Sequence, residues 1–217
     1  MLPREFYARP TLDVARDLIG KVFVHVTAAG IAAGAIVEAE AYIGESDPAC
    51  HAAPGPTTRN APLYGRPGVA YVYLNYGIHY LVNAVTEPEG SPAAVLIRAL
   101  EPVEGEALMR RRRARGTGRR HDGFASTELC RGPGNLTRAL GITLRQNRLD
   151  LTSDALRIED RGLPPREVRW SRRIGITVGT EAEWRCFALG SAAVSGTREE
   201  GKGNREKPFP FLPSPAR

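Results

Sequence analysis

Two carboxylates and a phenol share one face of a predicted strand, and such groups could do acid–base chemistry. The motif Glu38-Ala39-Glu40-Ala41-Tyr42 lies in residues 36–43, which alternate between polar and apolar side chains from Val37 onward. Successive side chains of a strand point to opposite faces, so Glu38, Glu40 and Tyr42 share one face and the other is apolar. Carboxylates beside an aromatic ring are candidate general bases. The alternative is an ordinary solvated strand face.

A single cation interrupts another apolar run. Arg98 lies in residues 93–100, which we predict to form a strand. A cation there must extend to solvent or meet a carboxylate. Glu38 or Glu40 on a neighbouring strand could be that partner, and the pairing would favour an ionised Glu beside a held water molecule. A purely structural ion pair is the alternative.

Four of the seven tyrosines lie in residues 71–80. Alternation places Tyr71, Tyr73 and Asn75 on one face of a strand. Tyr76 precedes Gly77 at a predicted tight turn between the strands 69–75 and 78–85, where a large side chain would protrude. A protruding aromatic side chain can wedge into a stack of bases. We expect Tyr71 and Tyr80 to pack within the sheet, and such packing is also the alternative for Tyr73 and Tyr76.

The elements that must position these residues form one α+β domain, with a mainly antiparallel, curved β-sheet flanked by helices. Thr11 is predicted to cap a helix over residues 12–19, which Gly20 ends. Residues 44–68 form a long Pro/Gly-rich loop of the kind that usually carries function. Further strands are expected at 21–26, 156–159, 174–177, 187–189 and 193–195, with helices at 103–115 and from Gly132-Pro133-Gly134 to about residue 140. We expect the domain to span residues 1–196 and a flexible Pro-rich tail to span 197–217.

Composition narrows the function. The 217 residues carry a net charge of +6, which suits a polyanionic partner. Lysine occurs only at positions 21, 202 and 207, so the body of the chain lacks a lysine for Schiff-base chemistry. No apolar run approaches the roughly 20 residues that span a bilayer, and the N-terminus lacks a signal peptide, so we expect a cytoplasmic protein. The three cysteines and four histidines lack metal-ligand spacing, so no metal or cofactor is expected.

Two basic features could contact phosphate. Arginines crowd residues 110–120, where a solvated loop is the alternative to a phosphate-binding patch. The Gly132-Pro133-Gly134 motif before a helix could present backbone N–H groups to a phosphate, although the motif alone is a weak signal.

Together these segments resemble the alkyladenine (3-methyladenine) DNA glycosylase family. The resemblance covers roughly residues 5–196 in collinear order, and the set is specific even though each piece is weak. It rests on residues 6–11 and 17–21, on 36–42, 47–51 and 58–60, on 68–73, Tyr76-Gly77 and Asn83, and on 96–102, Gly132-Pro133-Gly134 and Gly190-Ser191.

The resemblance implies roles for individual residues. Glu40 matches the general base that activates the water attacking C1′, Arg98 matches the arginine that helps hold this water, and the Val194 carbonyl matches a further water contact. Tyr76 matches the intercalating tyrosine. The pocket for the flipped base is implied at Tyr42, His51, Tyr73, Asn83 and Leu96. Two positions depart from the family pattern: Asn135 stands in place of lysine and Ala192 in place of proline.

The resemblance implies a monofunctional DNA glycosylase that initiates base excision repair. We expect it to act as a monomer, in the cytoplasm with the nucleoid, on double-stranded DNA that contains alkylated purines, and to leave an abasic site. The expected substrates are 3-methyladenine and 7-methylguanine, with hypoxanthine slower or not excised. Two alternatives are a non-catalytic damaged-DNA-binding protein and a glycoside hydrolase using Glu38 and Glu40, which would lie roughly 7 Å apart.

Overall fold

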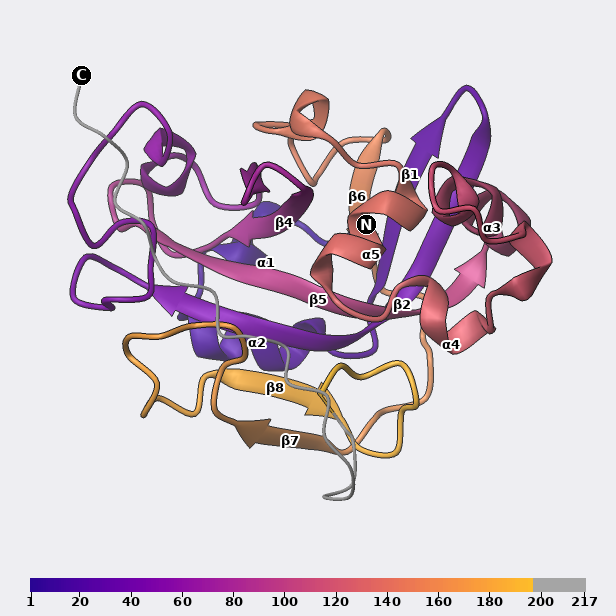
Figure 1. Ribbon diagram of the computed structural model, residues 1–217. Helices are drawn as coiled ribbons and strands as arrows, with labels where there is room; N and C mark the ends of the chain where they lie inside the picture. The colour runs from indigo at the N-terminus through magenta and orange to yellow at the C-terminus, as the bar shows by residue number, and fades with distance from the viewer. Residues whose placement is uncertain (197–217) are drawn as a thin grey trace.

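A computed structural model describes residues 1–196, which form one curled antiparallel sheet of eight strands flanked by helices (Figure 1). The predicted fold class is confirmed. The strand order is β3-β4-β5-β2-β1-β6, and β8 joins β2 on one side and β7 on the other. The strands are β1 Val22–Thr27, β2 Gly30–Ile43, β3 Ala70–Asn75, β4 His79–Val85, β5 Ala93–Glu104, β6 Leu156–Glu159, β7 Val168–Ser171 and β8 Arg185–Ala188. The predicted tail at 197–217 lies outside the described residues.

Strands β2 and β5 are the longest strands and pair with each other along the middle of the sheet (Figure 1). Strands β1 and β8 also pair with β2, and β4 pairs with β5. Both are longer than expected: β2 begins at Gly30, and β5 continues past Glu101-Pro102 to Glu104. Their pairing shifts register between Ala33 and Gly34 and around Glu38. A Cβ at Gly34 would lie 2.8 Å from the carbonyl oxygen of Glu101. Only glycine fits this close crossing, and such irregularities bend the sheet into its curl.

Five α-helices, some of them short, flank the sheet within the described part of the chain. They are α1 Arg4–Tyr7, α2 Thr11–Leu18, α3 Glu106–Ala114, α4 Ser126–Leu129 and α5 Pro133–Leu140, with 3-10 turns at Ala61–Tyr64, His121–Gly123 and Leu144–Gln146. The prediction that Thr11 caps α2 is wrong, because the helix begins at Thr11 itself. The Glu87 carboxylate accepts from the Thr11 amide (2.7 Å) and hydroxyl (2.8 Å), so a residue distant in sequence satisfies this helix end.

Two predicted strands are absent from the described residues. Residues 174–177 are irregular, and β7 lies at Val168–Ser171 instead; residues 193–195 form a turn. In both segments a carboxylate side chain accepts the hydrogen bond of a backbone amide that would otherwise pair with a neighbouring strand. The Ile174 amide donates to Glu40 (2.7 Å) and the Ser195 amide to Glu38 (2.8 Å). No helix among residues 1–196 has the length and apolar character to cross a membrane.

Strand β2 is buried on both faces at its centre, which differs from the expected half-exposed strand. On one face, Ala39 pairs with Cys186 of β8, whose thiol contacts the carbonyl of Ala15 in α2 (3.3 Å). Helix α2 therefore covers the apolar face of β2. Glu38 and Glu40 point to the other face and are also fully buried. Buried carboxylates need partners, and the site supplies them.

Candidate active site

One face of the sheet carries the side chains that line a cavity of about 1030 Å³. The pairing of β2, β3, β4 and β5 aligns Tyr71 with Asn83, Asn83 with Leu96 and Tyr42 with Ala94, so alternate residues of four strands meet there. The loop between β2 and β3 adds Cys50 and His51. Of the predicted site residues, the cavity wall includes Tyr42, His51, Tyr73, Tyr76, Asn83, Leu96 and Arg98.

Glu40 lies directly behind this wall rather than on it. Its carboxylate accepts hydrogen bonds from the Tyr42 hydroxyl (2.9 Å), from Arg98 (3.1 Å) and from the Ile174 amide (2.7 Å). All three donors belong to residues that line the cavity. Three residues of the cavity wall therefore separate the carboxylate from the cavity, and each of them donates a hydrogen bond to it.

Glu38 has a different set of partners, two residues along the strand. Its carboxylate accepts from Arg98 (2.9 Å), from Arg185 (2.7 Å) and from both the amide and the hydroxyl of Ser195. Burial raises the pKa of Glu38, but the charges of Arg98 and Arg185 and the Ser195 amide outweigh burial and hold this pKa below its ordinary value. Glu38 is therefore an ionised anchor for two arginines.

Arg98 joins the two carboxylates. Its Nε donates to Glu38 and its terminal nitrogen to Glu40, while the residue is 6% exposed. The predicted partnership between Arg98 and these glutamates is thus present, and it involves both of them. Attraction to Glu40 and Glu38 outweighs the effect of burial and raises the pKa of Arg98. With Arg185, the cluster holds two negative and two positive charges in the interior.

Aromatic rings line much of the cavity. His51 and Tyr73 pack edge to face with centroids 4.4 Å apart, and Tyr71 lies 5.3 Å from Tyr73. Tyr42 has the Arg173 guanidinium over its ring at 4.7 Å, and Arg173 is itself held in a buried ion pair with Asp47. The Arg173 contact fixes the Tyr42 ring in place.

His51 is neutral at physiological pH. Burial, with a smaller contribution from the charge of Arg59, lowers the pKa of His51 to about 4. Its Nδ1 shares a hydrogen bond with the Tyr71 hydroxyl at 2.8 Å. Tyr71, predicted to pack within the sheet, is buried and also lines the cavity. The imidazole therefore adds no positive charge to the cavity wall at that pH.

Tyr76 lies at the tip of the β3–β4 hairpin and is 46% exposed. Its φ of 51° and the 69° of Gly77 are the left-handed values that a tight hairpin turn requires. The predicted protruding position is therefore present. The hairpin rests on the start of α5, because a Cβ at Gly134 would lie 2.8 Å from Cγ of His79.

The Val194 carbonyl accepts a hydrogen bond from Nε of Arg131 at 3.1 Å, and Val194 does not line the cavity. Its neighbour Ser195 does, and connects this turn to Arg98 (3.3 Å). The sequence interpretation did not single out Arg131, although it directly precedes Gly132-Pro133-Gly134 at the cavity wall. Asn135 donates a hydrogen bond to the Arg131 carbonyl and accepts one from the Arg113 side chain.

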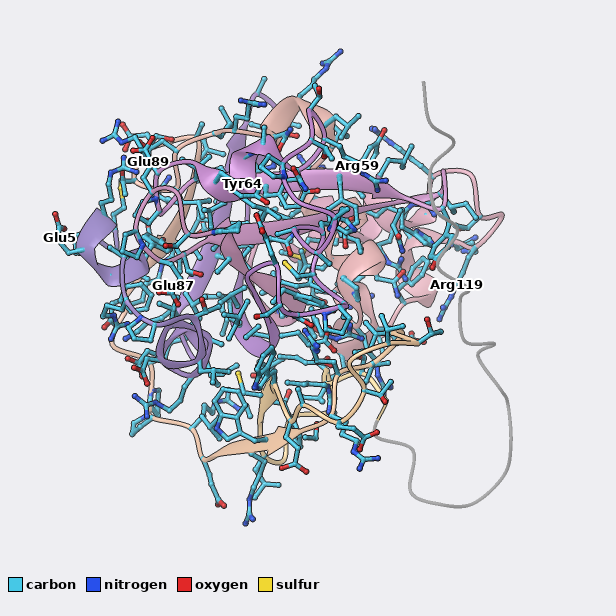
Figure 2. The ribbon with its side chains drawn as sticks, turned by 90° about the vertical axis from the view of Figure 1, so that its left-hand side faces the viewer. Glu5, Arg59, Tyr64, Glu87, Glu89 and Arg119 are labelled. Atoms are coloured by element: carbon cyan, nitrogen blue, oxygen red, sulfur yellow. The ribbon has the colours of Figure 1, made fainter. Side chains whose placement is uncertain are left out.

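The arginines of residues 110–120 do not line the cavity. Several have structural partners: Arg110 pairs with Glu106, Arg119 with Glu128, and Arg112 donates to the last carbonyls of α5. Figure 2 shows Arg59 and Arg119 toward one end of the molecule and Glu5, Glu87 and Glu89 toward the other.

The cavity offers no reactive thiolate, and the described residues offer no metal-ligand cluster. Cys50 lines the cavity, but burial raises the pKa of its thiol to about 11, so it is protonated at neutral pH. Across residues 1–196, no cluster of three His, Cys, Asp or Glu side chains could hold a metal ion.

Comparison of the sequence with known proteins identifies one family, on which a sequence profile and several relatives agree. Residues 5–192 match the sequence profile of methylpurine-DNA glycosylase. A relative from Chlorobium phaeobacteroides (strain BS1) is 48% identical over 200 residues, which cover 91% of this chain and 96% of that protein. Relatives from Methanocella arvoryzae and Rubrobacter xylanophilus are each 48% identical over 90% and 87% of this chain, and over 96% and 95% of their own lengths. All three are named, provisionally, as 3-methyladenine DNA glycosylases. The chain belongs to the methylpurine-DNA glycosylase family, whose enzymes hydrolyse N-glycosyl bonds.

Proposed function

We propose that residues 1–196 form a monomeric DNA glycosylase domain that excises 3-methyladenine and 7-methylguanine from double-stranded DNA. The damaged nucleotide would leave the helix and enter the aromatic cavity. Water would then replace the base at C1′ and leave an intact abasic site for base excision repair, in the cytoplasm with the nucleoid. The observation that carries this proposal is the position of the Glu40 carboxylate. It lies directly behind the cavity wall and accepts hydrogen bonds from three wall residues, Tyr42, Arg98 and Ile174.

Glu40 is the proposed general base. Because it lies behind the wall, we expect the attacking water to reach it between Tyr42 and Arg98, by replacing one of their hydrogen bonds to the carboxylate. Arg98 would orient this water while Glu38 holds Arg98 from the other side. A purine alkylated at N3 or N7 is a cation and already a good leaving group, so one base can suffice where most sugar hydrolases need two carboxylates.

The cavity suits a cationic purine. Its wall contains Tyr42, Tyr71, Tyr73 and neutral His51. An electron-rich ring contributes on the order of 1–2 kcal/mol to binding a desolvated cation. Asn83 and Leu96 lie opposite each other on β4 and β5 and would shape the far side of the pocket. Neutral hypoxanthine would gain less from this cavity, so we expect slower excision or none.

Extrusion of the nucleotide costs roughly a few kcal/mol. Tyr76, at the tip of its hairpin, would fill the gap in the duplex and offset part of this cost. The proposed enzyme is monofunctional because the cavity wall contains no lysine among the described residues, and Lys21 is paired with Asp160. Strand cleavage would need such an amine.

The position of Glu38 speaks against a glycoside hydrolase that uses both glutamates, because its carboxylate is fully buried and does not line the cavity. Its general acid would need a raised pKa. The pKa of Glu38 is instead lowered by Arg98 and Arg185, which outweigh its burial. Glu38 is therefore poorly suited to act as that general acid.

Release of bases from alkylated duplex DNA tests the proposal. Purified protein is incubated with methylated duplex, and free 3-methyladenine and 7-methylguanine are measured by chromatography, with strand integrity examined with and without alkali. We expect free base, and strand breaks only after alkali. Binding without release would favour a damaged-DNA-binding protein, and breaks without alkali would contradict a monofunctional enzyme.

A further inference from the structure

The cavity wall holds two arginines in very different electrostatic situations. Arg98 is neutralised by Glu38 and Glu40. The Arg131 side chain donates one hydrogen bond, from Nε to the Val194 carbonyl, and forms no ion pair with any described residue. No Asp or Glu is among the described residues that line the cavity. The terminal nitrogens of Arg131 thus contribute an uncompensated positive charge to the wall.

The backbone holds Arg131 close to the proposed reaction centre. The Leu100 amide donates to the Cys130 carbonyl (3.3 Å), which ties this segment to β5 two residues beyond Arg98. On its other side, Arg131 bonds the carbonyl of Val194, and the next residue, Ser195, bonds both Arg98 and Glu38. The guanidinium is partly buried and is oriented through its Nε. Its two terminal nitrogens can still donate to a ligand.

The chemistry of the substrate decides what this ligand is. A guanidinium repels an alkylated purine, which is cationic, so Arg131 is badly suited to contact the base. The nucleotide also carries phosphodiesters, which a planar guanidinium binds well. We propose that Arg131 binds a nonbridging phosphate oxygen next to the extruded nucleotide while its Nε holds the Val194 carbonyl. This inference rests on the proposed function.

Salt dependence of binding separates this role from a structural one. The dissociation constant for a duplex with a tetrahydrofuran abasic-site mimic is measured between 50 and 200 mM NaCl. Loss of one phosphate contact lowers the slope of log K against log[NaCl] by about 0.9. We expect this for Arg131→Gln, whereas Arg131→Lys keeps the wild-type slope. Arg16→Gln is the matched control, because Arg16 is exposed on α2, on the opposite face of the sheet.

Thermal unfolding of each variant checks that it is folded. A folded Arg131→Gln variant with the wild-type slope would overturn the inference and leave Arg131 as a brace for Val194; if the wild type still released alkylated bases, the proposed function would stand. If the wild type neither released bases nor preferred the abasic mimic, the proposed function would fail, and the role of Arg131 with it.

Discussion

Replacing Glu38 with glutamine tests whether the buried charge cluster holds the site together. Every group that contacts the Glu38 carboxylate is a donor: Nε of Arg98 at 2.9 Å, Nε of Arg185 at 2.7 Å, and the amide and hydroxyl of Ser195. Glutamine has nearly the same shape, but its NH₂ group would face one of these donors. Arg98 would then keep Glu40 as its carboxylate partner, whereas Arg185 would keep only the Ser171 hydroxyl and the Ser195 carbonyl.

The size of the effect follows from burial. Glu38 is fully buried, and Arg98 and Arg185 are each 6% exposed. Removing one partner from such a buried pair costs about 3–5 kcal/mol, because the remaining charge is uncompensated. For a chain of this length, the melting temperature should fall by roughly 6–20 °C. Because Glu38 would no longer hold Arg98 through its Nε, Arg98 would lose its position for orienting the water and base excision should slow.

Denaturant unfolding of a double-mutant cycle measures the coupling. Arg185→Gln alone leaves an excess negative charge, and the double variant Glu38→Gln/Arg185→Gln restores neutrality. The double variant should therefore be more stable than the sum of the single losses predicts, by about 1–3 kcal/mol. Strict additivity, or a loss below about 1 kcal/mol for Glu38→Gln, would refute the electrostatic reasoning.

The stability that Glu38 contributes should also depend on pH. The pKa of Glu38 is lowered from the ordinary 4.5, because Arg98 and Arg185 outweigh burial. The unfolded chain therefore takes up this proton at a higher pH than the folded protein does. The stabilisation is fully present above pH 4.5 and is lost as pH falls through the lower folded value. The stability difference between wild type and Glu38→Gln should be constant above pH 4.5 and shrink below it.

Three further perturbations address other parts of the site. The pKa of His51 falls from 6.5 to about 4 on folding, so the unfolded chain binds this proton first and wild type should lose about 3 kcal/mol of stability as pH falls from 6.5 to 4. His51→Gln should lose less over the same range, and equal pH curves would contradict the assignment. Gly134→Ala should cost about 1–3 kcal/mol, because the new Cβ would lie 2.8 Å from Cγ of His79; wild-type stability would show that the hairpin does not rest on α5. Tyr76→Ala should slow excision from duplex DNA by roughly 5- to 150-fold and affect single strands much less, whereas equal losses on both substrates would remove the wedge role.

The strand that carries Glu40 and the hairpin that carries Tyr76 could be predicted because their signals are local. Alternation from Val37 to Ile43 and a tyrosine before a turn glycine are visible within a few residues. The same alternation could not show that both faces of β2 are buried. That depends on Arg185 of β8 and on the turn at Ser195, which lie 147 and 157 residues beyond Glu38.

The wall formed by residues 174–178 was the least predictable part of the site. An apolar pattern favoured a strand there, but the backbone is shaped by a buried Arg173–Asp47 pair and by the Ile174 amide bonding to Glu40. Such contacts leave no period in the sequence. Arg131 was missed for a similar reason, since one arginine among 30 basic residues is distinguished only by its neighbours in space.

Single-turnover excision by Glu40→Gln tests the central claim, that Glu40 is the base behind the cavity wall. Duplex DNA with one alkylated purine is saturated with enzyme, and base release is timed for wild type, Glu40→Gln and the surface control Glu89→Gln. A general base contributes about 10²- to 10⁴-fold, so Glu40→Gln should be slower by that factor while still binding the abasic mimic, and Glu89→Gln should match wild type. Release by Glu40→Gln at the wild-type rate would show that another group activates the water.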